Sequence, residues 1–229
     1  LPPPLHRQYR GLPLPPRDAM RSVGGGKYGF SKRVWLQNKY YPEGHGTADN
    51  FWSLDELRLI LDTLLGCNAQ VIYNHPELSL LGATDVNDQG KGGKGFALGD
   101  QQLLKKKYSS HIATGALLLL PHLARTEWRA VSYNEVQLRV LSKSSCFLAP
   151  QGGASYLTFY QPGLHVVNDK TGKERCVSAN LASDGKAGTY WHYYTRLASD
   201  AGESIIYNVN GNRTRLKAAL DVMCRTEVC

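Results

Sequence analysis

The feature that most constrains the fold is an alternation of strand-like and helix-like segments that begins near residue 33. Residues 33–37 have an apolar centre that is typical of a buried strand. Residues 53–65 carry leucine and isoleucine at helical spacing, and Ser53 with Glu56 three residues later is a capping-box signature. Residues 69–73 form a second short apolar segment. This order predicts two parallel strands joined by a crossover helix.

The same alternation continues to the C-terminal end of the chain. We expect further helices over residues 100–108, 133–142 and 213–223, and a helix that opens at residues 153–160. Further strands are expected over residues 115–120, 146–149, 164–168 and 204–209, with long irregular loops over residues 82–99 and 169–202. Strands separated by helices predict an α/β fold with a Rossmann-like parallel sheet and helices on both faces.

Residues 1–30 differ in composition from the rest of the chain. They contain two proline-rich runs, Leu1-Pro2-Pro3-Pro4 and residues 12–16, and the break Gly24-Gly25-Gly26. Proline-rich segments adopt extended conformations and form no core of their own. We therefore expect an extended proline/glycine-rich N-terminal arm over residues 1–30 and one Rossmann-like domain over residues 31–229.

The charge balance favours an anionic ligand. The chain has 27 lysines and arginines against 19 aspartates and glutamates, a net charge of +8. Only Lys105-Lys106-Lys107 form a run, and no nucleic-acid-binding motif accompanies them, so we expect no nucleic acid as a partner. The longest apolar run, residues 116–120, is too short to cross a bilayer, so no membrane span is expected in this chain.

The five cysteines form no CxxC motif and no metal-ligand spacing with histidine. Cys67 and Cys146 lie beside apolar segments and are interpreted as buried thiols. Cys224 and Cys229 are close enough in sequence to pair in an oxidising compartment, although an odd total leaves one cysteine unpaired. The sequence alone leaves the redox compartment open.

The strongest candidate ligand site is the segment Gln151-Gly152-Gly153-Ala154-Ser155, where an expected strand runs through two glycines directly into a helix. Ligands of open parallel sheets bind at the carboxyl ends of the strands. Glycines permit a close backbone approach, and the free amides of a helix N-terminus attract phosphate, with the Ser155 hydroxyl as a further donor. A tight strand-to-helix turn without any ligand is the equal alternative.

Other polar side chains near expected strand ends suit a nucleotide ligand. After the first strand, Asn38 can hydrogen-bond a sugar or base and Lys39 can neutralise a diphosphate, with a plain polar loop as the alternative. Glu135, in a first helical turn, can hold ribose hydroxyls or simply interact with the helix dipole. His45 is the candidate catalytic base, with a solvated loop histidine as the alternative, and His75 can line the same cleft.

Several short segments together match a known family. They are Val34, Leu36-Gln37-Asn38-Lys39-Tyr40, Asn50-Phe51, Leu54, Val71-Ile72-Tyr73-Asn74, Pro76, Tyr133-Asn134-Glu135-Val136-Gln137-Leu138, Cys146-Phe147 and Gln151-Gly152-Gly153-Ala154-Ser155. Over about residues 33–168 the chain resembles bacterial and viral glycosyltransferase-like proteins with a GT-B type C-terminal domain.

The resemblance implies a glycosyltransferase domain that binds a nucleotide-sugar donor, without a tightly bound metal or other cofactor, for transfer to a glycan or other hydroxyl acceptor. The implied donor-binding residues are Asn38, Lys39, Glu135, Gln151, Gly152, Gly153 and Ser155. The chain departs from the family at Tyr160-Gln161-Pro162-Gly163, where Phe-Gly-Gly is common. A GT-B enzyme also needs a second domain, which residues 1–30 cannot supply.

That second departure keeps two alternatives open. One is a fragment whose missing domain completes the acceptor site. The other is a degenerate, non-catalytic glycosyltransferase fold that acts as a structural or accessory subunit of a larger assembly, with protein partners bound through the N-terminal arm. An enzyme of another reaction class is a third interpretation, since a fold does not dictate a function.

Overall fold

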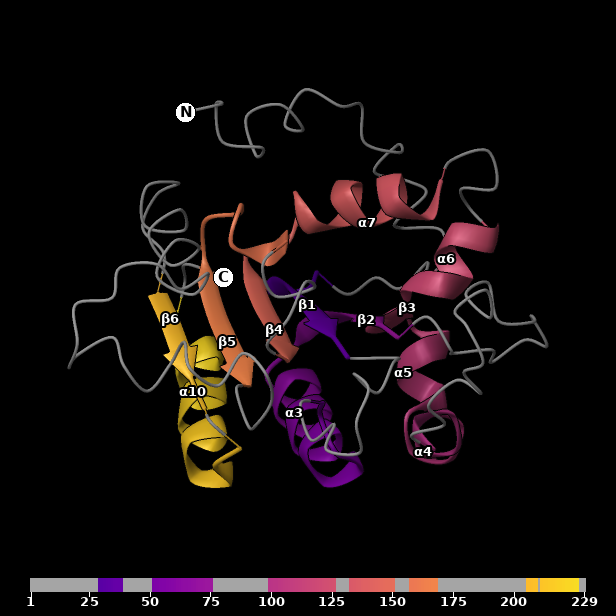
Figure 1. Ribbon diagram of the computed structural model, residues 1–229. Helices are drawn as coiled ribbons and strands as arrows, with labels where there is room; N and C mark the ends of the chain where they lie inside the picture. The colour runs from indigo at the N-terminus through magenta and orange to yellow at the C-terminus, as the bar shows by residue number, and fades with distance from the viewer. Residues whose placement is uncertain are drawn as a thin grey trace, which may run out of the picture.

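Six parallel strands between two layers of helices form the body of the structure, a computed structural model shown in Figure 1. It describes residues 29–38, 51–75, 99–126, 132–150, 157–168, 205–209 and 211–226. The strands are β1 Lys32–Gln37, β2 Ala69–Asn74, β3 Leu117–Leu119, β4 Cys146–Pro150, β5 Leu164–Asn168 and β6 Ile205–Asn208. The helices are α3 Leu54–Gly66, α4 Asp100–Lys107, α5 Ser109–Ala113, α6 Leu120–Thr126, α7 Tyr133–Leu141 and α10 Arg213–Arg225.

The strand order is β3-β2-β1-β4-β5-β6, and every neighbouring pair is parallel. This is the order of a doubly wound, Rossmann-like sheet. Every residue of β1 from Val34 onward is buried, as is every residue of β2, β4 and β5. A central strand that is covered on both faces has this continuous apolar character. The predicted α/β fold class is confirmed, and the predicted N-terminal arm lies almost wholly outside the described residues.

Alternate residues of the strands face two separate apolar cores. On one face α3, α4, α5 and α10 pack against side chains such as Leu36, Tyr73 and Leu148. On the other face α6 and α7 pack against Trp35, Ile72 and Phe147 and their neighbours. Because the side chains of a strand alternate with a period of two, each loop at a strand end can present polar groups to either face.

Local capping explains where the longer helices begin. Ser53 precedes α3 and forms both hydrogen bonds of the capping box with Glu56, as the sequence predicts. The side chain of Ser132 caps α7 by accepting the Glu135 backbone N–H, and that of Asn212 caps α10 by accepting the Arg215 backbone N–H. The helices α5 and α6 were not predicted. Residues 115–120 form a shorter strand than expected, because Leu120 already opens α6 and Pro121 suits the first turn of a helix.

The prediction for two cysteines is wrong. Cys67, at the end of α3, is not a free thiol, because it forms a disulfide with Cys224 of α10, 157 residues further along the chain. Cys224 is therefore not free to pair with Cys229. Cys146 is buried as predicted but is also disulfide-bonded. The suggestion that Cys224 pairs with Cys229 relied on closeness in sequence. The actual pair forms because α3 and α10 lie side by side on the same face of the sheet.

The last residue of the segment 160–163 has a structural reason to be glycine. Gly163 has a φ of +138°, and a Cβ atom at this position would clash with the backbone carbonyl oxygen of Ser145. The next residue, Leu164, donates its backbone N–H to the same oxygen at 3.1 Å as β5 begins beside β4. A glycine is needed here because only glycine combines this conformation with so close a backbone contact.

Candidate functional site at the carboxyl edge of the sheet

The strand order reverses between β1 and β4. From β1 the chain continues to β2 and β3 on one side, and from β4 to β5 and β6 on the other. In open parallel sheets, ligands bind in the crevice at such a switch point, outside the carboxyl ends of the strands. Asn38 and Lys39 directly follow β1, and residues 151–155 directly follow its neighbour β4. Two of the predicted donor-binding segments thus leave adjacent strands at the switch point.

Most of the predicted site residues lie outside the described part of the chain. These are the candidate base His45 and the predicted donor-binding residues Lys39, Gln151, Gly152, Gly153 and Ser155. The helix expected from residue 153 likewise lies mostly outside it. Their roles stay predictions, and only Asn38 and Glu135 of the original set have described side chains.

Asn38 is fully buried and bonds to the protein itself. Its side-chain Nδ2 donates to the backbone oxygen of Trp52 at 3.1 Å, and the Trp52 backbone N–H donates to Asn38 Oδ1 at 2.9 Å. The Trp52 indole N–H donates to the backbone oxygen of Gln37 at 3.0 Å. These bonds join the end of β1 to the residue before the cap of α3. Asn38 therefore fixes both ends of the segment that contains Lys39 and His45.

A second polar cluster lies on the α7 face of the same edge. Asn74, the last residue of β2, donates through Nδ2 to Gln37 Oε1 at 2.6 Å and to Gln137 Oε1 at 3.1 Å. Its Oδ1 accepts from the hydroxyl of Tyr133. The cluster connects β1 and β2 to the first turns of α7. Buried polar groups are costly unless they are paired, so a movement that broke these bonds would be unfavourable. The bonds therefore hold the four side chains in a fixed arrangement.

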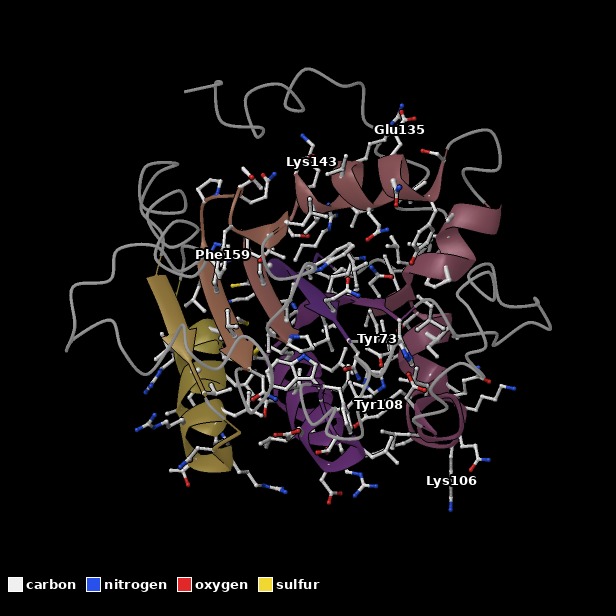
Figure 2. The ribbon with its side chains drawn as sticks, viewed as in Figure 1. Tyr73, Lys106, Tyr108, Glu135, Lys143 and Phe159 are labelled. Atoms are coloured by element: carbon white, nitrogen blue, oxygen red, sulfur yellow. A yellow bond between two sulfur atoms is a disulfide. The ribbon has the colours of Figure 1, made fainter. Side chains whose placement is uncertain are left out.

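A third group faces α4. His75 follows β2 and is 1% exposed, and its Nδ1 lies 2.6 Å from Oδ2 of Asp100, the first residue of α4. The hydroxyl of Tyr73 donates to the same carboxylate oxygen at 2.8 Å, and the backbone N–H of Gln101 donates to Oδ1 at 3.0 Å. Figure 2 shows Tyr73 between the sheet and the helices α3 and α5. We call His75 and Asp100 the dyad.

The electrostatics of the dyad favour a charged carboxylate. Burial acts to raise the pKa of Asp100, but the hydrogen bond and charge of His75, with the donations from Tyr73 and Gln101, hold that pKa below its usual value. The Nε2 atom of His75 is buried and has no hydrogen-bond partner among the described residues. Sequence reasoning placed His75 in the cleft but missed Asp100, which looks like an ordinary acidic residue at a helix start.

Glu135 does not join these groups. Its carboxylate accepts from Arg139 one turn along α7 at 2.5 Å, and its side chain is 39% exposed. Figure 2 shows Glu135 on the side of α7 that faces away from the sheet. Its backbone N–H donates to the Ser132 cap, and an acidic residue in a first helical turn is favourable in itself. The helix-dipole alternative accounts for this geometry.

A hollow of about 510 Å³ between α3 and α4 is a weaker candidate for an anion. Its cations are Arg58, Lys106 and Lys107. Arg58 pairs with Asp55 at 3.4 Å and Lys107 with Asp62 at 2.5 Å, so two of the three charges are already offset. Exposed side chains of this kind bind anions only weakly.

Other classes of site find no support in the described ranges. Among these residues, no three His, Cys, Asp or Glu side chains gather where they could hold a metal ion. No helix of the described part is both long and apolar enough to cross a membrane. Comparison with models of known protein families, with curated proteins and with solved structures found no match. The function is therefore inferred from fold and side-chain geometry.

Proposed function

We propose that this chain is the donor-binding domain of a glycosyltransferase, and that it holds a nucleotide sugar at the carboxyl edge of the sheet for transfer to a hydroxyl acceptor. One observation carries the proposal. The strand order reverses between β1 and β4, and the two segments that leave these neighbouring strands carry Asn38-Lys39 and Gln151-Gly152-Gly153. An anionic ligand at this point meets backbone amides from one side and a lysine from the other.

Each proposed contact follows from simple chemistry. The amides after Gly152 and Gly153 donate to the diphosphate, because glycine leaves the backbone open to close approach. Lys39 offsets the negative charge that builds on the departing nucleoside diphosphate. The positive net charge of +8 favours the approach of an anionic donor. The rigid Asn38–Trp52 link supports this role, because it fixes the direction in which the chain leaves β1.

The described polar groups favour an enzyme over a purely structural subunit. Buried polar networks at both faces of the carboxyl edge are costly to maintain, and a structural subunit would be served as well by apolar side chains there. Perturbed, buried titratable groups gather at functional sites more often than elsewhere. Asp100 of the dyad is such a group, and the dyad lies one strand away from the switch point.

The test is a calorimetric titration of the purified chain with uridine and guanosine diphosphates and their sugars. Wild type should bind one of them saturably. Lys39→Ala should weaken binding about 10- to 100-fold, since a hydrogen bond to a charged group contributes about 1.5–3 kcal/mol. Gly153→Asp should abolish it by placing a carboxylate against the phosphate.

Two matched variants lie at the opposite edge of the sheet. Lys143→Ala removes an exposed lysine just before β4, and Gly29→Asp adds a carboxylate where no heavy atom lies within 4 Å. Both should bind like wild type. A folded wild-type chain that binds no nucleotide, or controls that lose binding to the same extent, would overturn the proposal in favour of the structural subunit.

A further inference from the structure

The dyad is a built site that the predicted donor contacts do not use. His75 lies one residue beyond the β2 position that pairs with Gln37, so it stands at the same edge as the switch point. Strands are spaced about 4.8 Å apart, and β2 is two strands from β4, which puts His75 about 10 Å across the sheet from the chain that leaves β4. A pyrophosphate and a sugar ring together span such a separation.

The hydrogen bonds fix which ring nitrogen of His75 carries the proton. Asp100 accepts from the Tyr73 hydroxyl and the Gln101 backbone N–H, and a carboxylate that receives these donors stays charged. A charged carboxylate 2.6 Å from Nδ1 can only accept there, so Nδ1 is the protonated nitrogen. In a neutral ring, Nε2 then carries the free lone pair. A carboxylate that orients an imidazole in this way is the usual support of a histidine base.

The lone pair of Nε2 has no protein donor in the described part of the chain, although the atom is buried. An unpaired buried acceptor costs about 1–3 kcal/mol. Trp35 Nε1, His111 Nδ1 and Arg139 Nε are also buried and unpaired in the described part of the chain, but only His75 Nε2 belongs to a histidine that a carboxylate holds at the carboxyl edge of the sheet. A hydroxyl group of a bound ligand would donate to it. We propose that His75 is the catalytic base of this domain and that Asp100 positions it to take the proton of the acceptor hydroxyl.

The proposal rests on the proposed function and specifies its chemical step. The acceptor oxygen forms a bond to the anomeric carbon as its O–H bond breaks, and the proton passes to His75 Nε2. The bond between the anomeric carbon and the diphosphate oxygen breaks, and its electron pair leaves with the nucleoside diphosphate. Asp100 keeps the Nδ1 proton in its hydrogen bond and stabilises the imidazolium that forms. A single displacement of this kind inverts the anomeric centre.

The same hydrogen-bond network connects His75 to Asn38, which begins the segment that carries Lys39. Asn38 Nδ2 lies 3.3 Å from the Tyr73 hydroxyl, which in turn donates to Asp100. Tyr73 and Asn38 are therefore positioning residues, and neither needs to touch a ligand. In this proposal His75, whose ring the network holds, is the base in place of His45, the base suggested by sequence.

The first measurement needs no ligand. Long-range proton–nitrogen NMR spectra of histidine-labelled wild type should show His75 protonated at Nδ1 and unprotonated at Nε2. Asp100→Asn should disturb this pattern, because the amide can donate to Nδ1 where the carboxylate could only accept. A wild-type His75 that is protonated at Nε2 would overturn the proposal.

The second measurement follows release of nucleoside diphosphate from the nucleotide sugar that wild type binds, with water as the acceptor. His75→Asn keeps a donor beside Asp100 and removes Nε2, so turnover should fall about 100- to 10,000-fold, the usual contribution of a general base. The affinity of His75→Asn for the nucleotide sugar should stay within about threefold of the wild-type affinity, a difference of less than about 1.4 kcal/mol in binding free energy. His111→Asn, on α5 at the other edge, is the matched control and should turn over like wild type. Circular dichroism checks that each variant is folded.

The outcomes separate the two proposals. Lost turnover with retained donor binding supports the base. If His75→Asn binds the donor and turns over within about threefold of wild type, the proposal that His75 is the base is wrong, and the proposed donor-binding function still stands. Failure of folded wild type to bind any nucleotide sugar overturns the proposed function and the proton transfer together, whatever the NMR shows.

Discussion

The disulfide between Cys67 and Cys224 should be a main source of stability. It joins the end of α3 to α10 across 157 residues of sequence, with Cα atoms 5.8 Å apart. Closing so long a loop removes conformational entropy from the unfolded chain, equivalent to about 5 kcal/mol at 25 °C. Disulfides usually contribute less than this limit, typically about 2–4 kcal/mol, so we expect about 3 kcal/mol for this bond. That is a large share of the usual stability of a domain, about 5–15 kcal/mol.

The test replaces both cysteines by alanine and measures the free energy of unfolding in urea. Val222→Ala is the matched control, because Val222 lies on α10 beside the disulfide and packs against the same core. It should cost only about 1 kcal/mol, as the loss of small apolar groups does. Peptide mapping without reducing agent should recover Cys67 and Cys224 in one linked peptide. Separate thiol peptides, or a double variant no less stable than Val222→Ala, would refute the reasoning.

Three further predictions concern single residues. Gly163→Ala should unfold the domain or lower its free energy of unfolding by more than about 4 kcal/mol, because the new Cβ meets the Ser145 carbonyl oxygen at a positive φ. Soluble yield and thermal unfolding measure this effect, and a melting temperature near that of wild type would contradict it. Lys32→Met should lower the free energy of unfolding in urea by about 1–3 kcal/mol. The reason is that Lys32 Nζ donates to three backbone carbonyl oxygens at the end of α10, at 2.7, 3.0 and 3.0 Å. An unchanged unfolding midpoint would argue against this cap. Burial lowers the pKa of His165 to about 4. The unfolded chain, with a histidine pKa of about 6.5, binds this proton first, so stability should fall by about 3 kcal/mol as pH drops from about 6.5 to about 4. In His165→Phe most of this slope should vanish, and a slope equal to that of wild type would refute the assignment.

Sequence patterns predicted the elements of the fold better than their arrangement. The capping box at Ser53 and the buried strand of residues 164–168 follow from local propensities, and both are found at the predicted positions. Strand order, the short helices α5 and α6 and the Cys67–Cys224 pair depend on contacts between distant segments. Periodicity within one segment carries no information about them.

The candidate site shows the same division. The chain that leaves β1 and β4 can be placed at a sheet edge from the strand-helix alternation alone. The partner of His75 could not be predicted, because Asp100 lies 25 residues away in sequence, beyond residues 76–98. Asn38 has the residue type of a ligand contact, yet its amide is bonded to Trp52 and Tyr73, which only the packed structure reveals.

The position of a bound pyrophosphate tests the central claim most directly. A crystal structure of the chain with its preferred nucleoside diphosphate should place the phosphates beside the backbone amides of Gly152 and Gly153, between the ends of β1 and β4. Phosphates bound in the hollow between α3 and α4, or an edge at β4 that is closed by side chains in the presence of saturating ligand, would contradict the account.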